Sequence, residues 1–245
     1  MRHGESMATL DPTLFGRVDP KHIPLSEWGY EQAVASGRAL RERFESEPAL
    51  QDKTLRIIYN THHRIVQSKD AFLEGFGHDR IASVNEEPLL AERNHGDFDG
   101  LDCEAQRALN PEIFDKLIHG DAYTRYTTPM PNGESMQDVQ TRMDQCTRKI
   151  QENTHANEVV LVISHGGNCR AIEERLTHYD ATWLEPDFSV PGTADIIRVK
   201  TDFTEPGISE TVIEGRKRPA ALPKDYKTQP HGPWAEADKA LMCQM

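Results

Sequence analysis

One segment constrains the fold of this chain more than any other. The run Glu158-Val-Val-Leu-Val-Ile163 leads directly into Ser164-His-Gly-Gly-Asn168. An unbroken run of β-branched and aliphatic residues is typical of a strand covered on both faces, as in the middle of a parallel sheet. The small residues that follow predict a tight turn, and Ala171 and Leu176 continue as one face of a helix. The segment therefore predicts a strand–turn–helix unit of an α/β protein.

Other segments extend this pattern along the chain. An apolar stripe over 30–44 predicts an amphipathic helix that Ser26 can cap. A second stripe over 136–150 predicts another, with Ser135 and Asp138 as a capping pair. Strands alternating with helices of this length predict a three-layer α/β/α sandwich with a mostly parallel central sheet. The further strand candidates are Leu55–Tyr59, Ile81–Asn85, Ala194–Lys200 and Ile208–Glu214.

The charge of the chain divides it into two parts. The 245 residues have a formal net charge of -12. Residues 1–214 carry 22 Lys and Arg minus 37 Asp and Glu, or -15, whereas residues 215–245 carry six minus three, or +3. We expect one domain over 1–214 and an extended or partly disordered tail over 215–245, with at most a short helix over 234–242. The basic cluster Arg216-Lys-Arg218 fits either a solvated linker or a docking element for an acidic partner.

Composition also excludes some classes of partner. An acidic domain disfavours nucleic acid and anionic membranes, which bind clustered Lys and Arg. No run approaches the ~20 apolar residues of a membrane span, and the first residues show no secretory signal pattern. Four cysteines without paired spacing indicate reduced thiols. We expect a cytoplasmic protein that binds neither nucleic acid nor membranes, in an oligomeric state that the sequence leaves open.

Two His-Gly pairs, His3-Gly4 and His165-Gly166, lie near opposite ends of the acidic domain. The second follows the predicted buried strand, so it falls at the carboxyl end of a sheet, where open α/β sheets bind ligands. The next helix offers free backbone N–H groups and a positive dipole end to an anion. An anion site at His165 is one interpretation, and a structural histidine in the turn is the other.

Six segments taken in chain order resemble the motifs of the histidine phosphatase superfamily, the phosphoglycerate mutase-like enzymes. Each motif is weak by itself, but their shared order makes coincidence unlikely. The resemblance spans residues 2–200 and implies the phosphoglycerate mutase-like fold. The segments are Arg2-His-Gly-Glu5, Pro24-Leu-Ser-Glu-Trp-Gly29, Thr61-His-His-Arg-Ile-Val-Gln-Ser68, Leu90-Ala-Glu-Arg-Asn-His-Gly-Asp-Phe-Asp-Gly100, Pro131-Asn-Gly-Glu-Ser135 and Ser164-His-Gly166.

The resemblance implies a phosphomonoester hydrolase that needs neither metal nor cofactor. His3 is then the nucleophile that forms a phosphohistidine, and Glu92 is the general acid and base. Arg2 and Arg64 bind phosphate oxygens with planar forks of donors, and they disfavour a charge on His3. His165 donates to the transferring oxygens. The loops are expected to add three phosphate contacts, from Ser6, Thr9 and Gly166.

Three features depart from the family pattern. Only Met1 precedes Arg2, where the family has a central strand. We therefore expect His3 on a flexible terminus, a sheet without its middle member and a gene product that begins further upstream. Thr9 stands where the family often has asparagine. Mutases of the family carry adjacent arginines for a substrate carboxylate, and none lie between Glu92 and Pro131, which favours a phosphatase.

Two alternatives remain beside the hydrolase, which we expect to act on a small phosphorylated metabolite or a phosphoprotein. One is a phosphoglycerate mutase-type phosphotransferase, and the other is a non-catalytic module that binds phosphate or docks a partner. A metal site at His62 and His63, with His95 or His165, lacks the Asp-rich ligand set of a metallophosphatase. We expect His62 and His63 at the mouth of the pocket or in the turn before Arg64.

Overall fold

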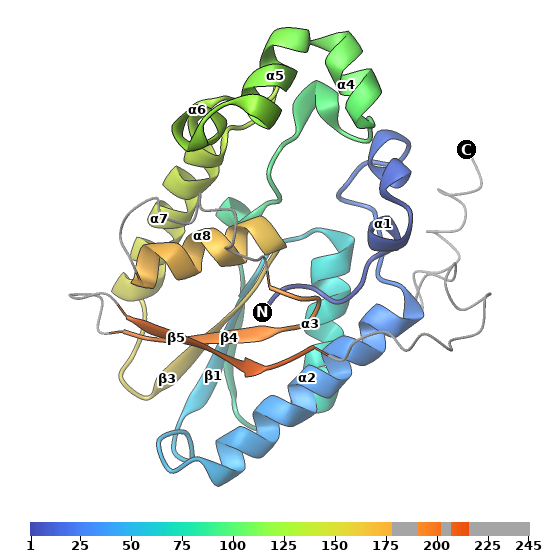
Figure 1. The fold of residues 1–245 in the computed structure, drawn as a ribbon. Coiled ribbons are helices and arrows are strands. Elements are labelled where there is room, and N and C mark those ends of the chain that lie inside the picture. Colours follow the sequence, from blue (N-terminus) through green and yellow to red (C-terminus); the bar gives the residue numbers. More distant parts are fainter. Residues whose placement is uncertain (178–190, 202–206, 216–245) are drawn as a thin grey trace.

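The computed structural model of the protein describes residues 1–177, 191–201 and 207–215 (Figure 1). Apart from Gly215, the predicted tail and its short helix over 234–242 lie outside these ranges. Within the described ranges, no helix is long and apolar enough to cross a membrane.

Three parallel strands form the central sheet, in the order β2-β1-β3 (Figure 1). They are β1 (Thr54–Tyr59), β2 (Ile81–Glu86) and β3 (Glu158–Ile163). A separate antiparallel pair follows, β4 (Ile196–Lys200) and β5 (Ile208–Ile213). The five predicted strands are thereby confirmed to within two residues at their ends.

Helices cover both faces of the central sheet, which confirms the predicted α/β class. On one face, α2 (Glu27–Ser46) and α3 (His63–Phe76) pack together over Leu55, Ile57 and Leu161. On the other, α7 (Met136–Glu152) and α8 (Gly166–Thr177) pack over Ile58. Both predicted caps are confirmed, with Ser26 before α2 and Ser135, in a capping box, before α7.

Shorter elements surround the carboxyl ends of the central strands. In Figure 1, α4, α5 and α6 form a group beyond the amino end of α7, and α1 lies near the amino end of α2. The short helices are α1 (Met7–Leu10), α4 (Cys103–Leu109), α5 (Pro111–His119) and α6 (Ala122–Thr127), with 3-10 turns at Pro12–Gly16, Pro88–Leu90 and Gly96–Phe98.

The expectation of a flexible amino terminus is wrong. Residues 1–3 run between β3 and β4 and bond to both neighbours through the backbone. The Ser164 N–H donates to the Met1 carbonyl (3.0 Å), and the His3 N–H donates to the Ser164 carbonyl (3.0 Å). On the other side, the Arg2 N–H donates to the Asp195 carbonyl (3.2 Å), and the Ala194 N–H donates to the His3 carbonyl (3.1 Å). Backbone hydrogen bonds to the end of β3 on one side and to the segment before β4 on the other therefore hold His3 in place.

Beyond these residues the gap between β3 and β4 is open. A cavity of about 630 Å³, which we call the β3–β4 slot, is lined by Val160 and Val162 of β3 and by Ile197 and Val199 of β4. The Met1 ammonium donates to the Val162 carbonyl (2.7 Å) at this slot, and burial lowers the pKa of the amine. Among the described residues, β3 and β4 belong to separate sheets.

Candidate active site

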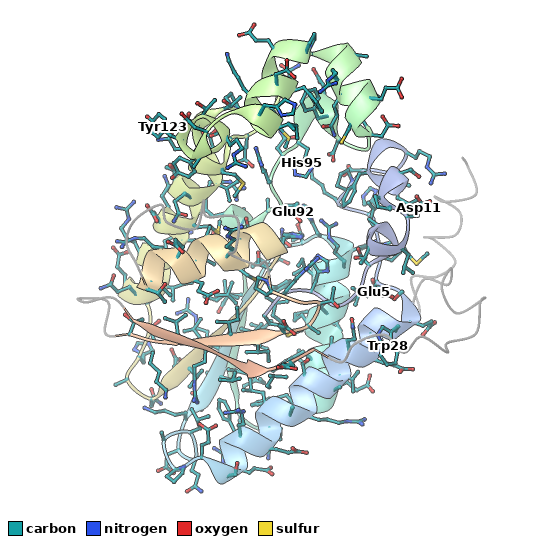
Figure 2. The ribbon with its side chains drawn as sticks, in the orientation of Figure 1. Glu5, Asp11, Trp28, Glu92, His95 and Tyr123 are labelled. Atoms are coloured by element: carbon teal, nitrogen blue, oxygen red, sulfur yellow. The ribbon has the colours of Figure 1, made fainter. Side chains whose placement is uncertain are left out.

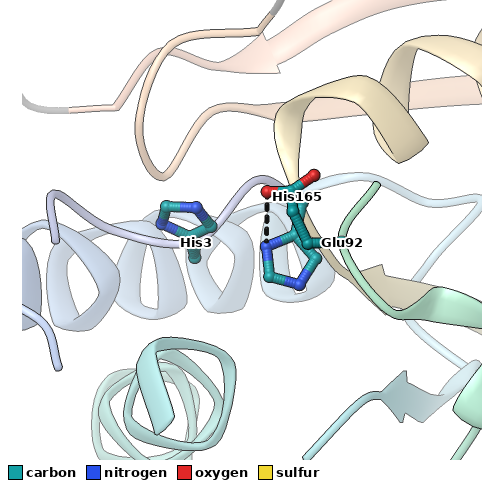
Figure 3. A group of neighbouring side chains, drawn as sticks. All are labelled: His3, Glu92 and His165. Carbon is teal, nitrogen blue, oxygen red and sulfur yellow. Dashed lines mark ion pairs between the residues drawn. The ribbon is translucent and has the colours of Figure 1, made fainter. Parts of the chain in front are cut away.

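Residues that lie far apart in the sequence meet at the carboxyl ends of β1 and β3. His3 arrives from the amino terminus, Arg64 from the first turn of α3 and His165 from the turn after β3. Figure 2 shows Glu92 on the segment between the central sheet and the group α4 to α6. One nitrogen or oxygen atom from each of His3, Glu92 and His165 lies within 4.8 Å of the other two (Figure 3).

The hydrogen bond of His3 determines which ring nitrogen is reactive. Nδ1 lies 2.6 Å from the Gly4 carbonyl oxygen. A carbonyl can only accept, so Nδ1 carries the hydrogen, and the lone pair of the neutral ring lies on Nε2. Burial lowers the pKa of His3 well below its usual value, and Arg64, His165 and Arg2 lower it further. His3 is therefore a neutral imidazole with an available Nε2.

Close backbone packing positions the loop after His3. The Gly4 N–H donates to Ser68 Oγ (3.1 Å), and the Glu5 N–H donates to Gln32 Oε1 (2.9 Å). A Cβ atom on Gly4 would lie 2.1 Å from the Gly29 carbonyl oxygen, so only glycine permits this approach. The motifs around Gly29 and Ser68 thus have a physical role, because they hold the loop that carries His3.

Asn60 orients His165, and the sequence analysis did not identify it. Its amide Nδ2 donates to His165 Nε2 (3.2 Å) and to the Leu90 carbonyl (3.0 Å). Because Nε2 accepts, the hydrogen of neutral His165 lies on Nδ1. Nδ1 is 3.0 Å from Glu92 Oε2, the ion pair drawn in Figure 3. The available signal was the position of Asn60, a polar residue directly after a predicted strand.

The Glu92 carboxylate lies between His165 and Arg64. Its Oε2 is 3.6 Å from Arg64 Nη2. Burial alone would raise the pKa of Glu92, but His165 and Arg64 hold that pKa well below its usual range. The Asn168 amide fixes the preceding backbone by donating to the Leu90 and Ala91 carbonyls, both at 2.9 Å. Glu92 is therefore an ionised carboxylate on a held segment.

Three buried donors surround this cluster. Arg2 Nε has no hydrogen-bond partner among the described residues, whereas Arg64 Nη2 and His165 Nδ1 face Glu92 Oε2, at 3.6 Å and 3.0 Å. Leaving a buried donor unpaired costs about 1–3 kcal/mol, more for a charged group. Together they offer what an anion with several oxygens requires.

Comparison with known proteins identifies relatives of this chain. The sequence profile described as the histidine phosphatase superfamily, branch 1, matches residues 1–211. The chain belongs to this superfamily. Among curated relatives, the 2,3-bisphosphoglycerate-dependent phosphoglycerate mutase of Chelativorans sp. is 28% identical over 219 residues, covering 88% of this chain and 97% of the relative. The enzyme of the same name from Methylobacterium radiotolerans is 29% identical over 218 residues, covering 87% and 93%.

Solved structures of the superfamily share the fold. A putative α-ribazole-5'-P phosphatase from Escherichia coli superposes with a TM-score of 0.65 at 20% identity, covering 89% of this chain and 97% of that one. A mycobacterial glucosyl-3-phosphoglycerate phosphatase, solved with VO3, has a TM-score of 0.62 at 21% identity, covering 86% and 94%. The expected phosphoglycerate mutase-like fold is thereby confirmed.

Some residues expected at the phosphate of a histidine phosphatase have other partners here. Arg2 Nη1 donates to the Pro191 carbonyl (2.7 Å), which leaves its unpartnered Nε as the buried donor. The hydroxyls of Ser6 and Thr9 bond to each other (3.1 Å) and close the capping box of α1. Gly166 is buried at the first position of α8. Arg64 and His165 are thus the expected phosphate ligands that the structure brings closest to Glu92.

The same three side chains are also a possible metal site. Two imidazoles and a carboxylate, from His3, His165 and Glu92, are a donor set that zinc can use. The charge of buried Arg64, 3.6 Å from Glu92, opposes a cation there and favours an anion. The arrangement therefore fits a phosphate better than a metal ion.

Proposed function

We propose that this histidine phosphatase superfamily member is a metal-independent phosphomonoester hydrolase with His3 as its nucleophile. The hydrogen bond from His3 Nδ1 to the Gly4 carbonyl carries the proposal, because it leaves the Nε2 lone pair for attack. The buried side chains of Arg64 and His165, both beside Glu92, support it, since their N–H groups can donate to phosphoryl oxygens.

In the first step, His3 Nε2 attacks phosphorus, and the bond from phosphorus to the ester oxygen breaks. The leaving oxygen takes a proton from Glu92. A bound phosphate dianion raises the pKa of this carboxyl by like-charge repulsion, so Glu92 holds a proton in the complex although it is ionised in the free protein. The product of the step is an alcohol and a phosphohistidine.

In the second step, water releases the phosphate. The Glu92 carboxylate takes a proton from water, the oxygen attacks phosphorus and the bond to His3 Nε2 breaks, returning a neutral imidazole. Arg64 and His165 stabilise the charge that spreads over the equatorial oxygens in both steps. Arg2 adds to this field, as its effect on the pKa of His3 indicates.

The direct test replaces His3 with alanine in the full chain. Turnover of an aryl phosphate should fall by ~10⁴-fold or more, and the acid-labile phosphoenzyme trapped during turnover should disappear. Retained turnover would mean that another group is the nucleophile. Tight binding of phosphate by the unmodified protein without hydrolysis would instead support the non-catalytic module.

The second candidate function is a phosphoglycerate mutase, which the names of the curated relatives favour. The arginines of the α4–α6 group favour the hydrolase. Arg107 stacks on Phe114, with Cζ 4.8 Å from the ring centroid, and lies 3.9 Å from Asp115, so it is engaged on an exposed helix. The two functions separate in one assay: we expect phosphate release to exceed transfer between the phosphoglycerate isomers.

We further propose that the substrate is a small phosphorylated metabolite or a phosphoprotein. We also propose that the protein acts in the cytoplasm, without nucleic-acid or membrane partners. The acidic body of the chain, -15 over residues 1–214 from 22 basic and 37 acidic residues, repels highly charged substrates. Turnover of a multiply charged phosphate ester should therefore rise with ionic strength, while that of a simple aryl phosphate changes little.

A further inference from the structure

His62 is a buried histidine that neither the fold nor the proposed reaction uses. It is the N-cap residue of α3, yet its side chain makes no capping hydrogen bond. Only its backbone groups make local hydrogen bonds among the described residues: the N–H donates to Asn60 Oδ1 (3.4 Å), and the carbonyl accepts from the Ile65 N–H (2.8 Å). Only 7% of the residue is exposed, and Nδ1 finds no partner among the described residues.

The ring of His62 borders the anion site. Its centroid lies 4.9 Å from that of His165, with the planes at 61°. The corresponding distance between His3 and His165 is 5.5 Å, so His62 and His3 both adjoin the same ring. The charges of His165, Arg64 and Glu92 act on His62, as does that of Lys21 to a smaller extent. His62 therefore approaches the cluster from the amino end of α3.

The protonation state of His62 suits it to bind a polar atom. Burial, followed by the charges of His165 and Arg64, lowers the pKa of His62 to about 3 against the opposing effect of Glu92. The ring is then neutral at physiological pH and has one N–H donor and one acceptor nitrogen. A buried nitrogen without a partner is costly, so its retention points to a ligand that pairs with it.

We propose that His62 is a further substrate-binding residue, whose unpartnered imidazole nitrogen hydrogen-bonds an oxygen of the bound phosphate or phosphomonoester. The inference rests on the proposed function for its ligand class, but not on turnover. It places a further neutral group next to His165.

The proposal gives His62→Leu two effects of opposite sign. Leucine removes the unpaired buried nitrogen, so the melting temperature of the ligand-free protein should rise by roughly 2–4 °C. The same change removes one hydrogen bond to the ligand, so phosphate binding should weaken about tenfold. If His62 only supported the fold, its replacement would lower the melting temperature and leave the phosphate affinity unchanged.

The experiment compares four full-length proteins: the unmodified chain, His62→Leu, His62→Gln and His63→Leu. The neighbouring His63 is the matched control, because its Nδ1 bonds to the His22 carbonyl (3.1 Å) at an exposed position. Inorganic phosphate is the probe, with affinity read from its shift of the melting temperature and KM measured with an aryl phosphate. We expect a tenfold loss of affinity and a matching rise in KM for His62→Leu, partial recovery for His62→Gln and no change for His63→Leu.

Equal phosphate affinity in the unmodified chain and His62→Leu would overturn the proposal. The proposal would also fail if phosphate did not raise the melting temperature of the unmodified chain. If His62→Leu fails to fold, His62→Gln decides, because a folded glutamine variant that is weaker than His63→Leu in phosphate binding supports the role. An unmodified chain that binds phosphate through His62 but does not hydrolyse esters would refute the hydrolase and leave this inference standing.

Discussion

The gap between β3 and β4 has one closed and one open end, and the two ends differ in how their backbone groups are paired. At the closed end, four backbone hydrogen bonds tie residues 1–3 to Ser164, Ala194 and Asp195. At the open end, the β3–β4 slot of about 630 Å³ separates apolar side chains of the two strands. The same pair of strands thus holds His3 at one end and lines a cavity at the other.

Few contacts hold His3 at the closed end. A three-residue bridge, together with the Gly4–Gly29 contact, is enough to bury His3 to 5% exposure. The Met1 ammonium lies where this bridge meets the slot, buried beside the Val162 carbonyl, and burial lowers its pKa. Variants near His3 and variants in the slot can therefore test the two ends separately.

The largest expected effect is on catalysis at the closed end. Glu92→Gln removes the group proposed to move protons in both steps, so kcat should fall about 10²–10⁴-fold. Val199→Ala, at the open end, should leave kcat within twofold, because Val199 lines the slot and not the site. Steady-state assays with an aryl phosphate measure both. Comparable losses in the two variants would erase the distinction between the ends.

The next effect is on the loop that carries His3. Gly4→Ala places a Cβ 2.1 Å from the Gly29 carbonyl oxygen, and we expect a loss of about 3 kcal/mol in the free energy of unfolding, with lower activity. Gly167→Ala is the matched control: nothing lies within 4 Å of the added Cβ. Within α8 alanine should stabilise by ~0.5–1 kcal/mol. Urea unfolding measures both, and equal stability of the two variants would contradict the packing argument.

Acid should destabilise the protein through its buried histidines. The pKa of His62 is lowered to about 3 by burial, then by His165 and Arg64, whereas the unfolded value is about 6.5. Below pH 6.5 the unfolded chain binds a proton that the folded chain does not. The free energy of unfolding should then fall by about 1.4 kcal/mol per pH unit, or roughly 2 kcal/mol by pH 5. Buried His3 and His165, whose pKa values are also lowered, act in the same direction.

The Met1 amine affects the free energy of unfolding in a different pH range. Burial lowers the pKa of the Met1 amine, so the folded chain releases this proton earlier than the unfolded chain, and stability should rise as pH increases towards ~8. Amino-terminal acetylation should remove this upper part of the profile and leave the acid part intact. Urea titrations between pH 5 and 9 test both, and a flat profile from pH 6.5 to 5 would refute the neutral histidine cluster.

The smallest expected effect comes from filling the slot. Five apolar, β-branched residues joined to the Met1 amine can pair with the free edges at Val160 and Ile197 and bury their side chains. After the cost of ordering them, we expect a net gain of about 1 kcal/mol in the free energy of unfolding. A Gly-Ser extension of equal length is the control, and an equal gain from it would show that the apolar slot contributes nothing.

Sequence reasoning recovered the elements whose signal is local. The run over 158–163 and the stripes over 30–44 and 136–150 each carry their own burial pattern, and the structure places β3, α2 and α7 there. The family resemblance likewise named His3, Arg64, Glu92 and His165, which the structure brings together, and their roles stay predictions. The predictions of strands and helices succeeded because short-range periodicity is a property of single segments.

The rest depended on pairs of segments that only folding brings together. The sequence alone determined the α/β class and the residue types for phosphate chemistry. Tertiary structure decided that residues 1–3 are held between two strand edges, that Asn60 sets the tautomer of His165 and that His62 is buried beside it. The physical reason is that hydrogen-bond partners and burial are properties of neighbours in space, and these neighbours lie up to 193 residues apart, as in the bond from the Arg2 N–H to the Asp195 carbonyl.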